Sequence, residues 1–232
     1  MRAVRAGRAV FVALLALAVA ACSKSPPASS LPAASTILQQ SSHAMTNVTS
    51  AHFTLNITGP AVTKVPIKSA TGDMDRYGNV QASASVTELG VLLNANVIIT
   101  GGTIYLKLVG NKYTTEPASD FYNPSLLLDP NQGVASLLGQ ATNGTTLDRE
   151  SVDSTPSYKV TASVPTAVLS GLTDLAPGQD RVTATLWIAV SGSRLLKAIV
   201  PFKIPGAKTD TVVTATLGQF NVPVSVTAPS SS

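Results

Sequence analysis

Cysteine is nearly absent from this chain of 232 residues, in which Cys22 is the only one. An intrachain disulfide is therefore excluded. Histidine is almost as scarce, with only His43 and His52, and the sequence contains no HExxH motif, GxSxG motif or Cys/His pair. Asp73 and Asp75 lie two residues apart on one expected strand, where solvation or turn capping is the simpler role. We expect neither an enzyme nor a bound metal or cofactor.

Charged residues are also sparse, at 12% of the chain. Lys and Arg number 16 and Asp and Glu number 12, but Arg2, Arg5 and Arg8 all lie within the first 22 residues. Without these three, 13 basic residues stand against 12 acidic ones, a net charge of about +1. The remainder contains no Lys/Arg cluster, which argues against binding to nucleic acid and against purely electrostatic binding to a membrane.

The first 22 residues have the pattern of an export signal. The three arginines precede an uncharged apolar run from Ala9 to Ala21. A basic start followed by a short apolar run is typical of a secretory signal peptide, and the run is too short and wrongly flanked for a membrane-spanning helix. Leu17–Cys22 (LAVAAC) resembles a bacterial lipobox, in which the cysteine is acylated and the residues before it are removed.

Cys22 is accordingly the expected lipidation site. A free thiol on an exported protein would be a reactive liability unless it is consumed by modification. The three acyl chains of a bacterial lipoprotein hold a protein firmly, whereas one chain does so only marginally. We expect an exported protein anchored to the outer face of the bacterial cell membrane, facing the periplasm or cell wall. A spectator cysteine in an uncleaved helix is the alternative.

The composition divides the chain into four segments. A stretch rich in Ser, Pro and Ala follows the cysteine and lacks apolar periodicity, which is typical of a flexible tether. The length beyond it suits one domain rather than two. We expect a signal peptide at 1–21, the acylated cysteine and tether at 22–35, a single domain at 36–227 and a disordered tail at 228–232.

Helical periodicity opens the domain. Ser35 or Thr36 can cap a helix that ends near Asn47 and carries one apolar stripe made by Ile37, Leu38, Ser41, Met45 and Val48. In the middle of the chain we expect a short helix near 126–128, a second helix at 131–141 ended by Asn143-Gly144, and a third at 165–172 opened by its proline.

Alternating apolar and polar residues predict strands over the rest of the domain. The predicted strands are 50–58, 65–74, 79–88, 91–100, 103–109, 113–116, 145–153, 157–164, 181–190, 195–204, 209–220 and 222–227. The fold class is therefore α+β and mostly antiparallel β, a meander of about ten strands with a few helices inserted.

So many long strands must curl, and the concave face must be filled. The expected inward positions include many small residues, and the chain has only five Phe and one Trp. These small residues are Ala82, Ala84, Ala95, Ala162, Ala184 and Ala215. Because close packing needs large side chains to meet across a core, such a lining would leave an apolar hollow suited to an apolar ligand. A solid core with the helices lying closer is the equally open alternative.

Short segments, from the end of the signal peptide through the mature chain, are similar, in order, to one known family. They are the lipobox Val19–Cys22, Ser50-Ala51-His52, Thr71-Gly72-Asp73, Ile104-Tyr105, Tyr122-Asn123-Pro124, Leu127-Leu128-Asp129-Pro130-Asn131-Gln132-Gly133 and Leu186-Trp187-Ile188. On this ordered set the chain resembles the mycobacterial LppX/LprAFG lipoprotein family. It departs from the pattern at Gly218-Gln219-Phe220, where a tryptophan is expected, and this affects only local packing.

The resemblance implies a curled half-barrel sheet of about ten strands, with helices covering its concave face around a hydrophobic cavity. It also implies that multiply acylated lipids or glycolipids, such as phosphatidylinositol mannosides, bind there and are carried across the cell envelope, sometimes alongside a membrane transporter. A cell-surface interaction or assembly protein without lipid transfer is the alternative.

The candidate lipid-binding residues are apolar residues at expected inward positions, each of which is equally compatible with an ordinary core. They are Leu55, Ile57, Val80, Ala82, Ala84, Val86, Val97, Ile99, Leu106, Leu127, Leu138, Val160, Ala184 and Leu186.

Overall fold

Antiparallel strands make up most of the domain, as the alternating sequence pattern predicts. The computed structural model describes residues 31–60, 67–88, 90–108, 110, 112–118, 124–167 and 175–229. The elements are, in chain order, α1 (Ala34–Thr46), β1 (Ser50–Thr58), β2 (Ile67–Asp75), β3 (Val80–Glu88), β4 (Val91–Thr100), β5 (Thr103–Lys107), β6 (Thr114–Pro117), the 3₁₀ helix η2 (Pro124–Leu127), α2 (Val134–Gly139), β7 (Thr142–Val152), β8 (Thr155–Pro165), β9 (Arg181–Ala189), β10 (Leu195–Phe202) and β11 (Thr211–Gly218).

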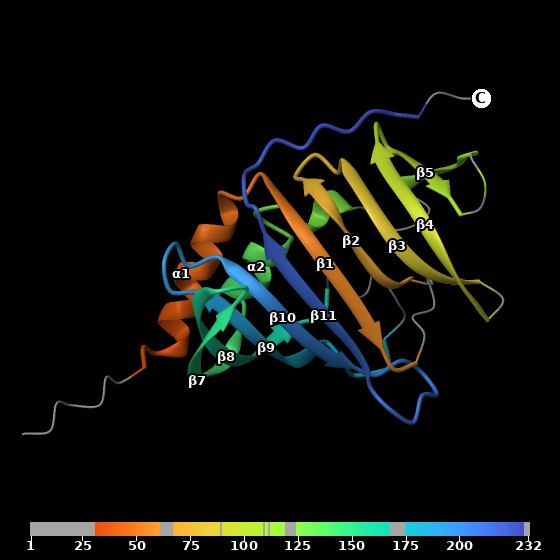
Figure 1. The fold of residues 1–232 in the computed structure, drawn as a ribbon. Coiled ribbons are helices and arrows are strands. Elements are labelled where there is room, and N and C mark those ends of the chain that lie inside the picture. Colours follow the sequence, from red (N-terminus) through yellow and green to blue (C-terminus); the bar gives the residue numbers. More distant parts are fainter. Residues whose placement is uncertain are drawn as a thin grey trace, which may run out of the picture. The chain divides into compact units, whose positions relative to one another are not determined.

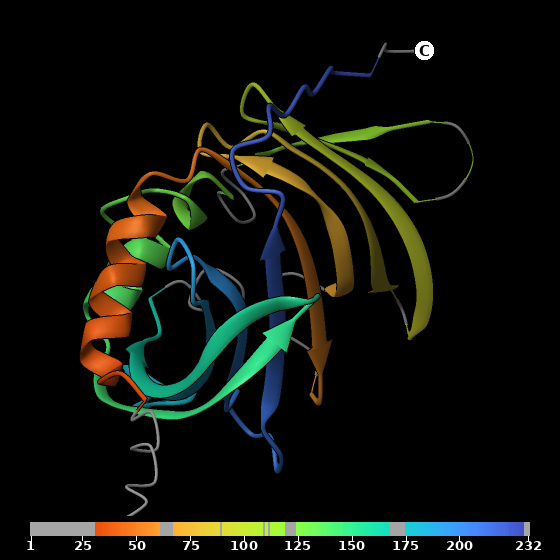
Figure 2. The same ribbon diagram turned by 60° about the vertical axis from the view of Figure 1, so that its left-hand side comes forward.

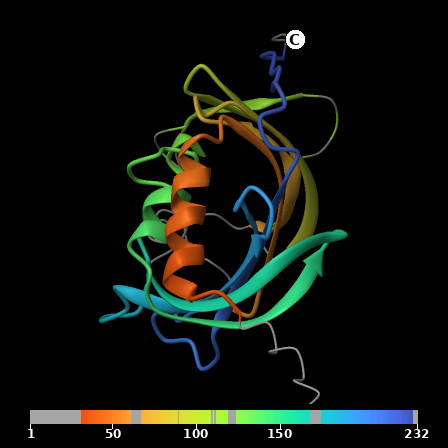
Figure 3. The same cartoon turned by 90° about the vertical axis from the view of Figure 1, so that its left-hand side faces the viewer.

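The strands form one 11-stranded sheet in the order β6-β5-β4-β3-β2-β1-β11-β10-β9-β8-β7 (Figure 1). The first and last strands pair at the centre, from His52 opposite Gly218 to Thr58 opposite Val212. The sheet is not closed, because β6 and β7 are its two edges. It curls into a half-barrel with α1 and α2 on the concave side, which we call the inner face (Figures 2 and 3). Among the described residues, no helix has the length and apolarity needed to cross a membrane.

Helix α1 presents the predicted apolar stripe to the sheet. Ile37, Leu38, Ser41 and Met45 are buried, and Val48 follows them into the core. The helix begins slightly earlier than predicted. Ala33 is its N-cap residue and makes no side-chain cap, so neither Ser35 nor Thr36 caps it. The helix therefore depends on packing of its apolar face rather than on a capping side chain.

The end of α1 is tied to the turn between β2 and β3. Arg76 donates hydrogen bonds to the carbonyl oxygens of Thr46, at 3.1 Å, and Val48, at 2.6 Å. Oδ1 of Asp75 accepts the backbone N–H groups of Tyr77 and Asn79 at 2.8 and 3.0 Å. The expected turn-capping role of Asp75 is confirmed, and the turn fixes where the helix meets the sheet.

Two of the helix predictions are corrected by the structure. Helix α2 ends at Gly139, and Asn143-Gly144 lies within β7 instead of ending it. Asn143 has a φ of 54°, and the strand register shifts between Thr142 and Thr145. A Cβ on Gly144 would lie 3.0 Å from atoms of Ala34 and Leu38, so the missing side chain lets α1 approach β7.

The third predicted helix does not begin at its proline. Pro165 is the last residue of β8 and pairs with Arg181 of β9. A proline at a strand end costs little because it gives up only one ladder hydrogen bond. Most of the remaining predicted helix, residues 168–172, lies outside the described residues.

The last predicted strand, 222–227, is wrong, whereas the other strands are present with ends that differ by up to three residues. Gln219 and Asn221 turn the chain after β11 with φ values of 44° and 64°. The Asn221 side chain then accepts a hydrogen bond from the backbone N–H of Thr49 at 2.8 Å. Because β11 already has β1 and β10 on its two sides, it offers no free edge for a twelfth strand.

Gly72 marks a point of close approach within the sheet. It lies on β2 between Phe53 and Ala82 in register, and a Cβ there would stand 2.6 Å from the Cα of Ala82. Replacing Gly72 by Ala should therefore destabilise the fold by about 1–3 kcal/mol through overpacking, measured as a lower midpoint of urea unfolding. Gly218→Ala is the matched control, because this strand glycine has nothing within 4 Å of a Cβ. Equal unfolding midpoints for the two variants would contradict the prediction.

Candidate binding surfaces of the sheet

The strand register sorts the side chains of the sheet onto two faces. One row of directly opposed residues crosses eight strands on the inner face, and all of its members are apolar and mostly small. The row is Val160, Leu186, Ala198, Ala215, Leu55, Ala70, Ala84 and Ala95. Because successive side chains of a strand point to opposite faces, the residues before and after each member face outward.

The structure brings the predicted lipid-binding residues together on this inner face and on the helices that cover it. Six belong to the buried hydrophobic cluster, namely Ile57, Val80, Leu138, Val160, Ala184 and Leu186. Four pack against that cluster with partial exposure, namely Leu55, Ala82, Ile99 and Leu127. Ala84 is buried, and Val86, Val97 and Leu106 are half-buried on β3, β4 and β5.

The inner face has two parts that differ in burial. On the side of β7–β9, α1 and α2 pack against the strands, and Val160 and Ala184 are fully buried. On β3–β5 six inward aliphatic side chains are only half-buried; we call this set the β3–β5 apolar surface, made by Val86, Leu93, Val97, Ile99, Ile104 and Leu106. The protein therefore has a solid core on one side and an accessible apolar surface on the other.

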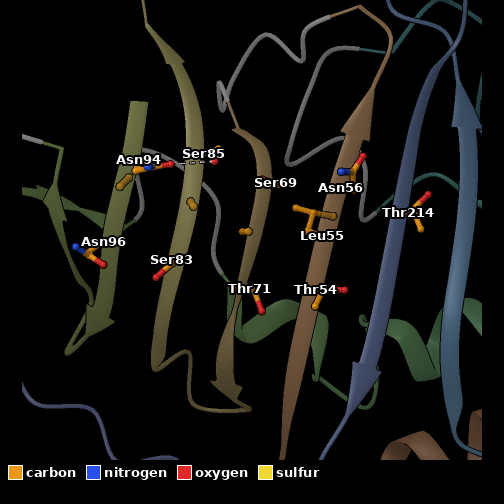
Figure 4. Close-up of a pocket in the computed structure, with 13 residues that line it drawn as sticks. Thr54, Leu55, Asn56, Ser69, Thr71, Ser83, Ser85, Asn94, Asn96 and Thr214 are labelled. Atoms are coloured by element: carbon orange, nitrogen blue, oxygen red, sulfur yellow. Dashed lines mark hydrogen bonds between the residues drawn. The ribbon is translucent and has the colours of Figure 1, made fainter. Parts of the chain in front are cut away.

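A hollow of about 650 Å³ lies on the opposite, outer face. Uncharged polar side chains from β1–β4 and β11 supply most of its lining, as Figure 4 shows. They are Thr54, Asn56, Ser69, Thr71, Ser83, Ser85, Asn94, Asn96 and Thr214. The hollow offers hydrogen-bond donors and acceptors without charge. Sequence reasoning missed it, although Ser, Thr and Asn at consecutive outward positions of the neighbouring strands β1–β4 were the available signal.

His52 and Asp73 lie on the same outer face. His52 Nδ1 is 2.7 Å from Asp73 Oδ1, and the two side chains are 36% and 52% exposed. Exposed pairs of this kind contribute little to stability, so the expected solvated role of Asp73 is confirmed. Within the described ranges, no three His, Cys, Asp or Glu side chains are grouped closely enough to hold a metal ion.

Trp187 also lies on the outer face, between two lysines on neighbouring strands. The ammonium groups of Lys159 and Lys197 lie 5.3 and 4.8 Å from its ring centroid. Its indole N–H donates to Glu150 at 2.8 Å, and Lys159 donates to the same carboxylate at 2.8 Å. These hydrogen bonds, from Lys159 first and Trp187 second, lower the pKa of Glu150 below its ordinary value.

Protonation of Glu150 should be visible in the fluorescence of Trp187, the only tryptophan. Because the pKa of Glu150 is lowered in the folded state, its stabilising contribution is present above the unfolded-state pKa and is lost as the pH falls through the folded pKa. Emission should therefore change in an acid transition centred below the ordinary pKa of glutamate. Glu150→Gln should remove this transition, and Asp148→Asn, a nearby control on β7, should keep it. A transition that persists in Glu150→Gln would contradict the assignment.

A family model described as LppX_LprAFG lipoprotein matches residues 33–226 of the chain. The lipoarabinomannan carrier protein LprG of Mycobacterium leprae is 31% identical over 239 residues, which cover 99% of each chain. The putative diacylated glycolipid transporter LprF of Mycobacterium tuberculosis is 28% identical, with 93% of this chain and 88% of the relative covered.

Two solved structures share the fold. The crystal structure of LprF from Mycobacterium bovis has a TM-score of 0.70 and 25% identity, and the match covers 84% of this chain and 96% of that one. The crystal structure of the Mycobacterium tuberculosis lipoprotein LppX has a TM-score of 0.61 and 24% identity, with coverage of 85% and 100%.

Proposed function

The chain belongs to the LppX/LprAFG lipoprotein family, and we propose that it is a membrane-anchored carrier of multiply acylated lipids or glycolipids. In this role it binds acyl chains in a hydrophobic cavity on the inner face of the half-barrel and carries them across the cell envelope. It acts by binding and release, without catalysis.

The β3–β5 apolar surface is the observation that carries the proposal. Inward aliphatic side chains there remain partly accessible, although the same face is solid core on the side of α1 and α2. Leaving apolar area in water is unfavourable, and an acyl chain would remove it at about 0.8 kcal/mol per buried methylene before entropic costs. Several chains lying on one face would add their contributions, so multiply acylated lipids suit this surface.

The names of the relatives favour the same class of ligand. LprG is named as a carrier of lipoarabinomannan and LprF as a putative transporter of a diacylated glycolipid. Both ligands join acyl chains to a sugar part. We therefore propose phosphatidylinositol mannosides and related glycolipids as ligands of this chain, with a membrane transporter as a further partner. The apolar wall would hold the acyl chains and leave the headgroup at the rim.

The described burial ranks the candidate contact residues. Val86, Val97, Ile99 and Leu106 keep accessible surface, so a ligand can touch them without moving the core. Val160 and Ala184 are fully buried, so contact with them requires their neighbours to move. We propose the first group as the wall of the site and the second group as its support.

Val97→Trp should block acyl-chain binding by filling the site. Val97 lies between Ala82 and Leu106 in register, on the accessible part of the inner face. If the tryptophan keeps about four methylenes of an acyl chain out of the site, lipid binding would weaken roughly a hundredfold. The measurement is mass spectrometry of lipid extracted from protein purified from a mycobacterial host.

Ile98→Trp is the matched control, because Ile98 is the next residue of the same strand and faces outward. It adds the same side chain on the other face and should retain its bound lipid. Circular dichroism of both variants reports that the sheet is formed. Undiminished lipid in folded Val97→Trp would remove this residue from the site.

Cys22→Ala should separate anchoring from binding. Cys22 lies outside the described residues, and we propose it as the acylated N-terminus of the mature protein. The variant should leave the membrane fraction for the soluble exported fraction, keep lipid binding in vitro and lose delivery in cells. Membrane retention equal to that of the natural chain, in a fractionation with an unrelated lipoprotein as reference, would overturn the anchor.

A second candidate is a cell-surface interaction or assembly protein that transfers no lipid. The outer-face hollow favours it, because its uncharged polar lining could receive a polar partner. Organic-solvent extraction of non-acylated protein discriminates between the two functions. Co-purified lipid favours the carrier, and a protein without lipid favours the interaction role.

A further inference from the structure

The turn between β3 and β4 is apolar, whereas turns between strands are usually polar. We use the name β3–β4 turn for Gly90 together with the residues that open β4, Val91-Leu92-Leu93, of which Val91 and Leu92 are 58% and 61% exposed. Gly90 reverses the chain with a positive φ, as Gly101-Gly102 and Gly192 do in other turns, but only here do two exposed aliphatic residues follow directly in the described chain. Two adjacent exposed aliphatic residues at a turn are unfavourable in water and indicate a surface that meets another apolar phase.

The turn is continuous with the β3–β5 apolar surface. Val91, Leu93, Val97 and Ile99 are alternate residues of β4 and share its inner face, with Ala95 between them. Burial increases from the exposed Val91 to the half-buried Leu93 and the buried Ala95. An apolar column therefore runs from the exposed turn into the face proposed to hold acyl chains.

The proposed lipid anchor at Cys22 would hold the domain close to a membrane, because only a short stretch of chain separates Cys22 from the described residues. Helix α1 ends at the β2–β3 turn, where Arg76 binds its last carbonyl groups, and its start lies one helix length away, about 20 Å. In Figures 1 and 2 the starts of α1 and β4 both lie in the lower half of the domain, at its opposite sides, whereas the β2–β3 turn lies near the top. Leu31 is nine residues from Cys22, a reach of about 30 Å when extended.

We propose that the β3–β4 turn is a membrane-contact site that inserts Val91 and Leu92 into the surface of a lipid bilayer. The contact would place the open end of the apolar column against the bilayer, so that an acyl chain could pass between the two without crossing water. This inference deepens the proposed carrier function and rests on it. Beyond residue 22 the sequence has no Lys/Arg cluster, so the contact depends on apolar burial and not on charge.

The test is binding of the full mature chain, carrying Cys22→Ala to remove the acyl anchor, to phosphatidylcholine vesicles in a flotation assay. The natural turn should bind with little dependence on salt, because screening weakens charge contacts and not apolar burial. The double variant V91N/L92N should bind about tenfold or more weakly, since burial of each side chain contributes to partitioning. Both positions are exposed, so its thermal unfolding should match that of the natural sequence.

Tyr77→Asn is the matched control. Tyr77 is 84% exposed on the β2–β3 turn, so it tests the same kind of substitution at the opposite end of β3. This variant should bind vesicles as the natural chain does. Equal binding by V91N/L92N and the natural chain would overturn the proposal, as would an equal loss in Tyr77→Asn. A natural chain that dimerises through the turn and ignores vesicles would assign the turn to a second copy instead.

The carrier function and the membrane contact of the β3–β4 turn can be contradicted independently of each other. Detergent-solubilised glycolipid should still bind V91N/L92N, because the β3–β5 apolar surface is unchanged. A protein that takes up no lipid while its turn still binds vesicles would overturn the carrier function alone. Normal lipid binding, together with vesicle binding by V91N/L92N that equals that of the natural chain, would overturn the membrane contact alone.

Discussion

The pairing of β1 with β11 is the interaction on which the rest of the structure depends. These strands come from the two ends of the domain, and His52 stands opposite Gly218 across more than 160 residues of chain. Their pairing joins the meander β1–β6 to the meander β7–β11 in one sheet. Such long-range pairing requires closure of a large loop and is entropically costly, so it must be supported by burial on the inner face.

The same pairing decides which edges stay open. With both chain ends at the centre, the short β6 and the long β7 become the edges, and the sheet curls without closing. Helix α1 covers the inner face next to β7, where Gly144 allows the close approach. The apolar side chains of β3–β5 lie on the other flank and stay half-buried. The asymmetry that suggests a carrier follows from topology and not from any single motif.

The two faces of the sheet divide the chemistry between them. Strict alternation places Ala, Val and Leu inward, and it places Ser, Thr and Asn outward around the hollow of the outer face. Trp187 is a large apolar exception on the outer face, where it is held between two lysines and bonded to Glu150. Val91 and Leu92 at the β3–β4 turn are the most exposed large aliphatic residues of the described chain, and for that reason the turn is the place where a bilayer is proposed to meet the protein.

The sequence by itself determined the local structure and the family. Alternation is a property of the strand backbone, so it predicted the strands and the face of each candidate wall residue, and the stripe of α1 followed from the helical period. Pairing depends on neighbours distant in the chain, so only the tertiary structure decided that β11 has no free edge for 222–227 and that Asn143-Gly144 bends a strand. Tertiary packing also separated the half-buried Val97 from the fully buried Val160, two inward valines that the sequence pattern could not tell apart.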